Sequence, residues 1–337
     1  MTNVFALTRT LVDIPSVSND EIRVGEFLFG ELSKLAAKHG GRVERMAVEG
    51  GRFNLFAAWG EPIVTLSTHM DTVPPFFASS EDGEFIRGRG SCDAKGIIAA
   101  MIAAVETLLR EGTRNIGLLF LVGEERNSVG ARAAAHEPRG ARYLINGEPT
   151  ENKLALASKG ALRLEISATG RMAHSGYPEL GESAIEKLLD TLEAVRRIPL
   201  PADALLGQST INIGTVTGGR APNVIADAAK AEVFVRLVGE PGPIRDAFRR
   251  EAGDRAEVKE IGHIPVMKFE GFDGLPTTVV SFTSDAPILG GAWGKALLIG
   301  PGSIHVAHTA EERIAKQELM EAVGIYTGMT RKLLGRG

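Results

Sequence analysis

The stretch PIVTLSTHMDTVPP, residues 62–75, joins an apolar run to an imidazole, a carboxylate and two prolines. The run predicts a buried strand that ends near His69, because Pro74 and Pro75 cannot donate hydrogen bonds to a continued ladder. Residues two apart in a strand point to the same face, so His69 and Asp71 are expected to lie side by side. That arrangement suits a metal-ligating imidazole oriented by a carboxylate, although a polar loop exposed to solvent would carry the same residues. The rest of the chain decides between these alternatives.

The composition of the chain excludes several classes of protein. With 337 residues, of which 44% are hydrophobic and 24% charged, it is long enough for two globular domains. A net charge of -4 with scattered Lys and Arg residues favours small-molecule partners over nucleic acid or a membrane surface. The single cysteine, Cys92, excludes an intrachain disulfide, and the first residues, MTNVFALTRTLVDIPSVS, do not resemble a signal peptide. No apolar run is long enough to span a bilayer, so we expect a cytoplasmic protein.

Apolar runs alternate with helical stretches up to about residue 159, which predicts an α/β domain whose largely parallel sheet is flanked by helices. The strand candidates are PIVTLST, IGLLFLVG and ARYLING. Between the first two lies DAKGIIAAMIAAVETLLREG, residues 93–112, which has apolar side chains at helical spacing and ends at Gly112. This segment is expected to form a helix that packs on the sheet.

The pattern changes to two-residue alternation between residues 160 and 264, which is typical of half-buried antiparallel strands. The alternating apolar residues are Leu162, Leu164, Ile166, Ile211, Ile213, Val233, Val235 and Leu237. Helical stretches follow the first and third of these strands, so the order β-α-β-β-α-β predicts a ferredoxin-like α+β domain. Buried-strand character returns in PTTVVSFTS and ALLIGPGS. The outer domain is therefore expected to comprise residues 1–159 and 265–337, with the second domain inserted between them.

Acidic and imidazole side chains follow the apolar runs of the outer domain. These residues are His69 and Asp71, Glu124 and Glu125, Glu148, His305 and His308, together with Asp93 at the start of the Ala-rich helix. Ligand sites in open α/β sheets lie outside the carboxyl ends of the strands. Acids that converge on one edge repel each other unless cations lie between them, so the pattern indicates a metal site.

Each of these residues also has a structural explanation. Asp93 would cap the helix that follows it. Thr309 and Glu312 fit a capping box at the start of the last helix. The remaining acids and histidines would lie in solvated turns and loops. Taken together, however, their repeated position after apolar runs favours a metal centre.

Seven motifs occur in order and cover nearly the whole chain: STHMDTVP, GRGSCDAKG, GEERNSVGA, GEPT, GRMAHSGYPELGESAI, GGRAPNVIAD and GPGSIHVAHTAEE. In these motifs the chain resembles the family of acetylornithine deacetylase, succinyl-diaminopimelate desuccinylase, aminoacylase and glutamate carboxypeptidase. The resemblance implies a zinc-exopeptidase-like catalytic domain interrupted by a ferredoxin-like domain that serves as a lid or for dimerisation. A homodimer is therefore expected.

The resemblance also implies a two-metal centre in which Asp93 bridges the ions. His69 and Glu148 would complete one metal site, and Glu125 and His308 would complete the other. Nitrogen and oxygen ligands without a thiolate suit zinc, with cobalt or manganese as alternatives. The cofactor prediction is thus two divalent ions per chain.

Further roles follow from the same resemblance. Asp71 would orient His69, and Glu124 would act as the general base. The two metals would polarise a scissile carbonyl and activate water, whose proton Glu124 would pass to the leaving amine. His174 of GRMAHSG would stabilise the oxyanion from the inserted domain of a partner subunit, although an exposed loop residue is the alternative.

Two residues of the inserted domain resemble substrate-binding residues of the family. Asn223 in APNVIAD and Arg236 in VFVRLV would bind the substrate carboxylate or the reacting carbonyl. The structural alternatives are a turn residue and an outward-facing strand residue. The stretch SFTSDAPIL departs from the family, because Pro287 stands where an arginine is common, which leaves Asp285 as no more than a helix cap.

The expected function is a metal-dependent amidohydrolase that removes the acyl group from an N-acyl amino acid such as acetylornithine. A dipeptidase or carboxypeptidase with the same dinuclear centre is the alternative. A non-catalytic metal-binding or interaction protein on the same scaffold is a third hypothesis. The presence of Glu124, His174 and all five expected ligands favours catalysis.

Overall fold

The computed structural model describes residues 2–335, which form two compact units. Unit 1 contains the chain up to Leu156, Phe269–Thr278 and the chain from Ser284 on, and unit 2 contains Ala157–Lys268 and Val279–Thr283. The predicted outer segment 265–337 therefore contributes two short pieces to unit 2, residues 265–268 and 279–283, and unit 2 begins three residues before the predicted boundary. The backbone N–H of Lys159 donates to the carbonyl of Val280 at 3.1 Å, which ties the second piece to the start of the unit.

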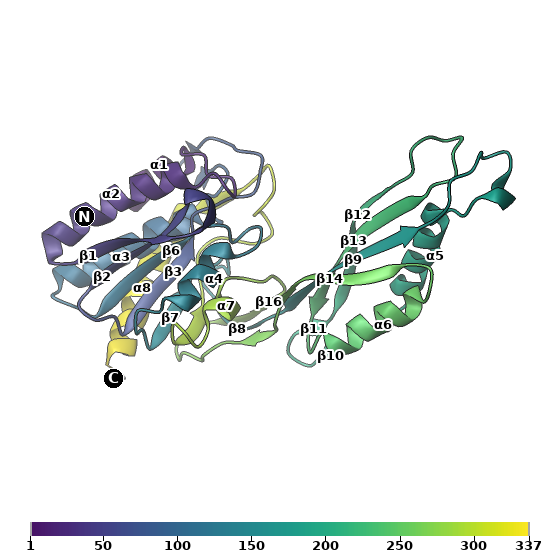
Figure 1. Ribbon diagram of the computed structural model, residues 1–337. Coiled ribbons are helices and arrows are strands. Elements are labelled where there is room, and N and C mark those ends of the chain that lie inside the picture. Colours follow the sequence, from purple (N-terminus) through teal and green to yellow (C-terminus); the bar gives the residue numbers. More distant parts are fainter. Residues whose placement is uncertain (1, 336–337) are drawn as a thin grey trace. The chain divides into compact units, whose positions relative to one another are not determined.

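A mixed sheet forms the centre of unit 1 (Figure 1). Its strands, in spatial order, are β1 (Arg42–Ala47), β2 (Phe53–Trp59), β6 (Ile116–Leu121), β3 (Val64–His69), β7 (Tyr143–Asn146), β17 (Lys295–Leu298) and β8 (Leu154–Ser158). Pairing is parallel from β6 through β3 and β7 to β17 and antiparallel toward both edges. The prediction of a largely parallel sheet is therefore wrong at the edges. The connection between β1 and β2 is too short for a parallel crossover, so these strands pair as a hairpin.

Helices pack on this sheet and complete the core of unit 1. They are α1 (Val4–Val12), α2 (Ile22–His39), α3 (Lys95–Arg110), α4 (Val129–His136), α7 (Ala286–Leu289) and α8 (Lys316–Leu334), with a short 3-10 helix, η1 (Glu49–Gly51). Both α2 and α4 contact β2, while α3 contacts β3 and β6 and is itself covered by α1 and α8. Every residue of β2, β3 and β6 is buried, as expected for strands covered on both faces. The helix predicted within residues 93–112 is confirmed as α3, and Gly112 takes up a left-handed φ of 84° just beyond it.

A three-stranded sheet lies beside the start of α8. It consists of β4 (Ser80–Glu81), β5 (Phe85–Arg87) and β18 (Arg313–Ala315), and β18 pairs antiparallel with β5. The capping box predicted for the last helix is wrong, because α8 begins at Lys316 and no side chain caps it. Glu312 is instead buried and faces the loop that follows β5.

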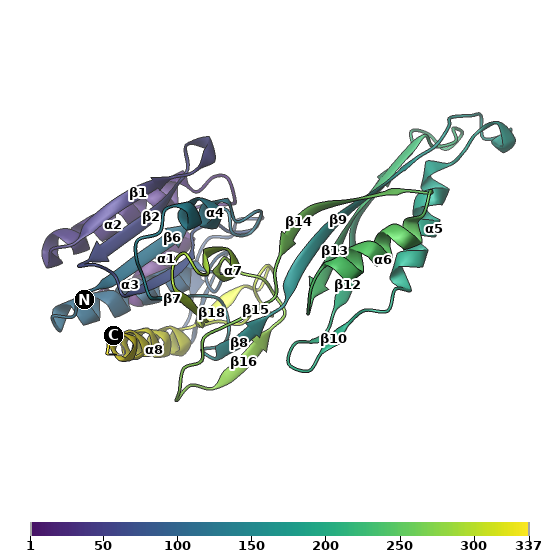
Figure 2. The ribbon, with the colours of Figure 1, turned by 60° about the horizontal axis from the view of Figure 1, so that its bottom comes forward.

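Unit 2 has the predicted ferredoxin-like order of elements (Figure 2). Its main elements are β9 (Gly160–Thr169), α5 (Ala184–Arg196), β12 (Thr210–Gly218), β13 (Ala228–Leu237), α6 (Gly242–Ala252) and β14 (Glu257–Ile264). The four strands form an antiparallel sheet in the order β12-β13-β9-β14, and apolar residues at alternate positions of β9 and β13 pack against the two helices. Shorter elements are η2 (Pro178–Leu180), β10 (Ala202–Asp203) and β11 (Gly207–Gln208). Two further short strands, β15 (Met267–Lys268) and β16 (Thr277–Val280), pair with β8 and so extend the mixed sheet rather than the ferredoxin-like one.

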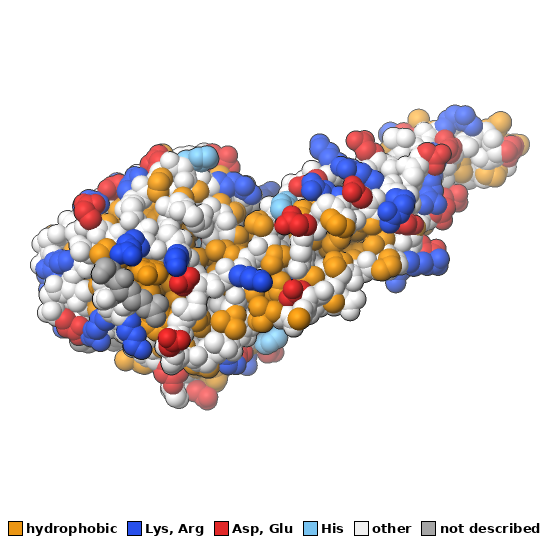
Figure 3. All heavy atoms as spheres, turned by 90° about the horizontal axis from the view of Figure 1, so that it is seen from below, with side chains coloured by type: hydrophobic (Ala, Val, Ile, Leu, Met, Phe, Trp, Pro, Cys, Tyr) orange, Lys and Arg blue, Asp and Glu red, His pale blue; other side chains and the backbone are white. Residues whose placement is uncertain are grey.

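The surface carries charges of both signs. On the face drawn in Figure 3, Lys and Arg side chains are interspersed with Asp and Glu side chains. Exposed ion pairs, such as that of Arg331 with Glu111, occur on the surface of the protein. No single-sign field therefore covers that face. Within residues 2–335, none of the helices combines the length and the apolar character needed to cross a membrane.

Candidate metal centre

His69 is the last residue of β3 and is almost fully buried. Its Nδ1 lies 3.0 Å from the backbone oxygen of Asp71 and 3.6 Å from Asp71 Oδ1. The carbonyl can only accept a hydrogen bond, so Nδ1 carries a hydrogen, and Nε2 is the atom that would bind a metal once it has lost its own proton. That Nε2 lies 3.0 Å from Asp93 Oδ1. The structure therefore orients the imidazole toward Asp93, mainly through the backbone of Asp71.

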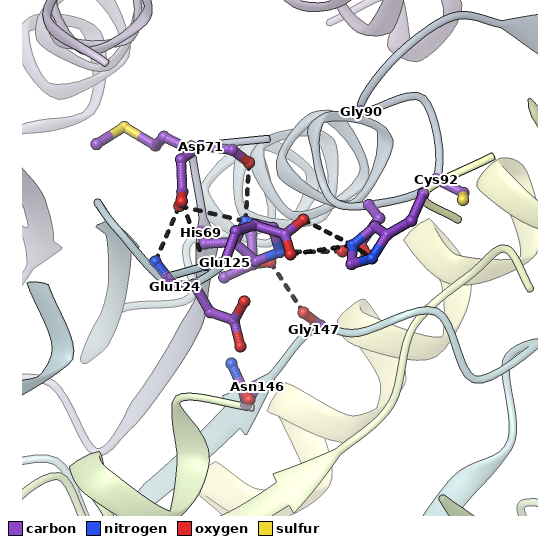
Figure 4. Close-up of polar contacts among 12 residues, drawn as sticks. His69, Asp71, Gly90, Cys92, Glu124, Glu125, Asn146 and Gly147 are labelled. Atoms are coloured by element: carbon purple, nitrogen blue, oxygen red, sulfur yellow. Dashed lines mark hydrogen bonds and ion pairs between the residues drawn. The ribbon is translucent and has the colours of Figure 1, made fainter. Parts of the chain in front are cut away.

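The carboxylate of Asp71 fixes the turn that follows β6. Its Oδ1 accepts a hydrogen bond from the N–H of Glu124 at 3.0 Å, and its Oδ2 accepts one from the N–H of Glu125 at 3.2 Å (Figure 4). Ser18, which the sequence did not single out, donates to Oδ2 at 2.6 Å. The side chains of Glu124 and Glu125 leave this turn in different directions (Figure 4). One carboxylate can therefore hold a cation while the other stays available for proton transfer.

His308 completes a second cluster of ligand atoms. Its Nε2 lies 3.0 Å from Glu125 Oε1 and 3.3 Å from Asp93 Oδ2. The backbone of His308 has a left-handed φ of 64°, which is uncommon for a residue with a side chain and is typical of strained functional loops. His305 is exposed and has no place in this cluster.

Two groups of three residues share Asp93. One group is His69, Asp93 and Glu148, the other is Asp93, Glu125 and His308, and within each group the ligand atoms lie within 4.8 Å of one another. Glu148 Oε1 is buried without a hydrogen-bond partner, an arrangement that a cation would satisfy. Nitrogen and oxygen donors without a thiolate suit a divalent ion such as zinc, so the residues fit the expected pair of metals.

The helix-cap explanation for Asp93 is wrong. The cap of α3 is Ala94, with no side-chain hydrogen bond, while the carboxylate of Asp93 lies between His69 and His308. Burial would raise the pKa of Asp93, but hydrogen bonds from the two imidazoles lower it far below its usual range. Asp93 is therefore ionised and available to both groups.

Two acids of the centre, the half-buried Glu124 and the buried Glu148, hold their protons tightly in the metal-free chain. Burial raises the pKa of Glu124 well above its usual range, and the charge of Glu148 adds to the effect. Burial likewise raises the pKa of Glu148, against the opposing influence of His69. A cation in this centre would stabilise the ionised forms of both acids.

Binding of zinc to the metal-free protein is expected to release about one proton from each of two imidazoles, in addition to those that Glu124 and Glu148 lose. Hydrogen bonds to Asp93 and Glu125 raise the pKa of His308 to about 10. Burial lowers the pKa of His69, but its contacts with Asp71 and Asp93 outweigh this and raise the pKa well above its usual value. Both rings are therefore cationic at pH 7 and must lose a proton to bind metal, so the apparent affinity rises with pH. Calorimetry in buffers of different ionisation enthalpy measures the release, and binding without release would contradict this prediction.

Asp285, at the start of α7, is a buried acid to which the sequence assigned no more than a capping role. Neither carboxylate oxygen has a hydrogen-bond partner of ordinary geometry, and no side chain caps α7. Burial raises the pKa of Asp285 to about 7, although the nearby Ser128 side chain lowers it. The capping role is therefore wrong. Ionisation of a buried carboxyl group without hydrogen-bond partners lowers the stability of the folded state.

Replacing Asp285 with Asn is expected to stabilise the metal-free protein above pH 7. The ordinary pKa of an aspartate is 3.8, so between about pH 4 and pH 7 the folded state keeps a proton that the unfolded chain has lost, and stability falls as pH rises. At roughly 1.4 kcal/mol per pKa unit the loss amounts to a few kcal/mol. Urea unfolding at pH 8 and pH 4 should show Asp285→Asn more stable than wild type only at the higher pH. Asp273→Asn, at an exposed acid, is the control; equal stabilities of wild type and Asp285→Asn at pH 8 would contradict the argument.

His174 and Asn223 lie on neighbouring loops of unit 2. His174 forms an isolated antiparallel bridge with Val224, and the N–H of Ser175 donates to the carbonyl of Asn223 at 3.0 Å. The ring of His174 is exposed and accepts a hydrogen bond from the N–H of Gly176 at 3.1 Å. These two predicted site residues are therefore close together within the unit.

Arg236 occupies a different part of unit 2. It lies near the end of β13, whereas the Asn223 loop precedes the first residue of that strand, Ala228, so about eight residues or roughly 26 Å of strand separate the two regions. Its guanidinium lies 4.6 Å from the ring centroid of Phe234. Within this unit the structure does not bring Arg236 together with His174 and Asn223.

Comparison with known proteins identifies relatives over the whole chain. The profile of peptidase family M20/M25/M40 matches residues 65–332. The chain is 39% identical over 339 residues to a peptidase M20 domain-containing protein of Schizosaccharomyces pombe, with 97% of this chain and 84% of that protein covered. It is 38% identical over 364 residues to a probable carboxypeptidase of Aspergillus niger, with 94% of this chain and 86% of that protein covered.

Solved structures share the fold at low sequence identity. A metallo-carboxypeptidase of the M20 family from Sulfolobus solfataricus superposes with a TM-score of 0.80 at 16% identity over 99% of both chains. Aminopeptidase PepT from Bacillus cereus gives 0.77 at 23% identity over 98% of both chains. A dinuclear metal-binding peptidase of the M20 family from Bacillus subtilis gives 0.69 at 17% identity over 98% of this chain and 97% of that one. These likenesses confirm the predicted α/β fold.

Proposed function

Since the chain belongs to peptidase family M20/M25/M40, we propose that it hydrolyses an amide bond whose leaving group is an amino acid with a free α-carboxylate. The observation that carries the proposal is the position of Asp93, which is shared by two groups of metal-ligand atoms next to Glu124. A centre of this kind suits hydrolysis of an unactivated amide, because bound cations would polarise the carbonyl while a neighbouring base takes a proton from the attacking water.

Two divalent ions held by these groups would polarise the scissile carbonyl. The chain supplies the proton transfers. Glu124 takes a proton from the attacking water and delivers it to the leaving nitrogen, a role that suits a half-buried carboxylate with a raised pKa. The carboxylate of Asp71 accepts a hydrogen bond from the backbone N–H of Glu124, so it fixes the backbone of Glu124 without engaging the Glu124 carboxylate that transfers the proton. His174 is our proposed donor to the oxyanion.

Two substrate classes share this leaving group and differ in the acyl group. The seven sequence motifs favour an N-acyl amino acid such as acetylornithine. The relative in Aspergillus niger is named a probable carboxypeptidase, which favours a peptide. Asn223 and Arg236 are proposed contacts for the substrate, and a guanidinium is well suited to a carboxylate in either class. Zinc is the metal that we propose for both.

A matched substrate panel tests the proposal. It contains acetylornithine, an unblocked dipeptide, the same dipeptide with an N-terminal blocking group, and the blocked dipeptide with a C-terminal amide. Hydrolysis of substrates with a free carboxylate, but not of the amide, is expected with the zinc-loaded protein. Preference for acetylornithine would assign a deacylase, preference for the blocked dipeptide a carboxypeptidase, and preference for the unblocked dipeptide a dipeptidase. Equal cleavage of the C-terminal amide would contradict the proposed leaving group.

We propose further that unit 2 forms a homodimer. β12 is an edge strand of its sheet, and apolar side chains are exposed both there and on α5, with Val216 at 53% and Leu189 at 55%. An open, apolar strand edge favours pairing with another copy. Light scattering coupled to size-exclusion chromatography tests this, and a monomer at micromolar concentration would reject it.

A further inference from the structure

Glu312 joins the segment that follows His308 to the loop that precedes Asp93. Its Oε1 accepts hydrogen bonds from three backbone N–H groups, those of Gly90 at 2.8 Å, Asp93 at 3.3 Å and Cys92 at 3.4 Å. Gly90 and Cys92 lie on the loop close to the ligand residues (Figure 4). The buried carboxylate of Glu312 therefore holds the backbone that carries the shared ligand Asp93. Glu312 itself lies only four residues after the other ligand, His308.

Arg89 extends this connection to a third loop. Its Nη1 lies 2.5 Å from Glu312 Oε2, and both side chains are buried. Its Nε donates to the carbonyl of Pro75 at 3.2 Å, and its N–H donates to the carbonyl of Phe77 at 3.2 Å. These carbonyls belong to the segment that follows His69. One ion pair thus contacts the three chain segments that carry His69, the shared carboxylate and the second imidazole.

We propose that Glu312 is a positioning residue, which sets the spacing of Asp93 and His308 and so the metal affinity of the centre. The inference rests on the metal-binding part of the proposed function and extends it to a residue outside both ligand groups. Glu312 touches no ligand side chain. It acts on the backbone N–H of Asp93 and, through four residues of chain, on His308.

Stability alone gives no reason for such a pair. Removing two charges from water costs about as much as their attraction returns, so a buried ion pair is often no more stabilising than apolar side chains of the same volume. The contacts of the Glu312 carboxylate, with three backbone N–H groups and the guanidinium of Arg89, are explained if this residue fixes the geometry of the loop.

Cobalt titration of the metal-free protein measures this role without any substrate. Wild type is expected to bind about two Co2+ ions per chain and to develop visible ligand-field absorption. For Glu312→Gln we expect cobalt affinity to fall roughly 10- to 100-fold, the usual effect of disturbing groups behind metal ligands, with an altered spectrum. Glu106→Gln is the matched control. Glu106 lies in α3, is buried and accepts a hydrogen bond from the N–H of Thr2 at 2.6 Å, far from the three segments.

The double variant Arg89→Met with Glu312→Gln separates positioning from stability. The single change leaves the guanidinium of Arg89 buried without its anion, which destabilises the fold, whereas the double variant removes both charges. We expect the double variant to regain thermal stability in the metal-free state and to keep the weakened cobalt affinity. Wild-type affinity and spectrum in either variant would overturn the inference. Absence of cobalt binding by wild type would overturn the metal centre itself, and failure of the substrate assignment alone would leave this result unaffected.

Discussion

Replacing Glu124 with Gln is expected to lower turnover by roughly 10²- to 10⁴-fold while the metal content stays unchanged. Glutamine has nearly the same shape and keeps the backbone N–H that donates to Asp71, so the turn after β6 is preserved. It cannot accept a proton from water at neutral pH. Glu124 also lies outside both groups of ligand atoms, so its loss removes no metal ligand. Steady-state kinetics together with elemental analysis of the same preparation measure both effects.

Glu125→Gln is the matched comparison for this variant. The two residues are adjacent, and the same Asp71 carboxylate accepts both N–H groups. Only Glu125 belongs to a ligand group, in which its Oε1 lies 3.0 Å from His308 Nε2. We therefore expect Glu125→Gln to lose about one metal ion per chain. If Glu124→Gln instead lost metal, or kept more than about a tenth of wild-type turnover, Glu124 would not be the base.

Asp93→Asn is expected to reduce bound metal from about two ions per chain to fewer than one and to abolish turnover. Asp93 is the residue that the two ligand groups share, and an amide of the same volume lacks the charge and one of the two oxygen donors. Elemental analysis after desalting measures the loss. The rise in Tm on addition of zinc offers a second readout, since a ligand that binds only the folded state stabilises it. Wild type should show that rise, and Asp93→Asn should not.

Glu148→Gln tests whether the effect of Asp93 depends on sharing. Glu148 belongs to one group only, so its variant is expected to keep about one metal ion and part of the zinc-dependent rise in Tm. Equal losses in the two variants would mean that the groups do not bind metal independently. Retention of two ions by Asp93→Asn would show that the carboxylate does not bridge.

The convergence of the candidate ligands could be predicted because it follows from parallel strands. His69 ends β3, Glu124 and Glu125 follow β6, and Glu148 follows β7, and these three strands are neighbours with the same direction. Their carboxyl ends must meet at one edge, whatever the details of the loops. The alternation of apolar residues likewise predicted the strands of unit 2, since every second side chain there packs against helices.

Strand direction at the sheet edges and the role of Glu312 could not be predicted. Periodicity reports which faces are buried and carries no information on whether a neighbour runs parallel, so the antiparallel strand β2 left no distinguishing signal. Glu312 meets Gly90 across 222 residues of sequence. Its local surroundings, with Thr309 three residues before it, read equally well as a helix cap. The capping role predicted for Asp285 is wrong for a related reason. Periodic patterns indicate which apolar positions are buried, but they carry no information on whether one isolated acid is buried.

The insertion of unit 2 between β8 and the later strands of unit 1 has a consequence for the order of events during synthesis. A ribosome delivers the chain from its amino end, so residues 157–268 have emerged before β17, His308 and α8 exist. Unit 2 has its own core and can fold at that stage, while the nascent sheet of unit 1 still lacks β17, one of the two strands that pair with β7. The ligand set is complete only when His308, which follows unit 2 along the chain, has left the exit tunnel. Metal capture at both ligand groups therefore comes after the synthesis of the whole of unit 2.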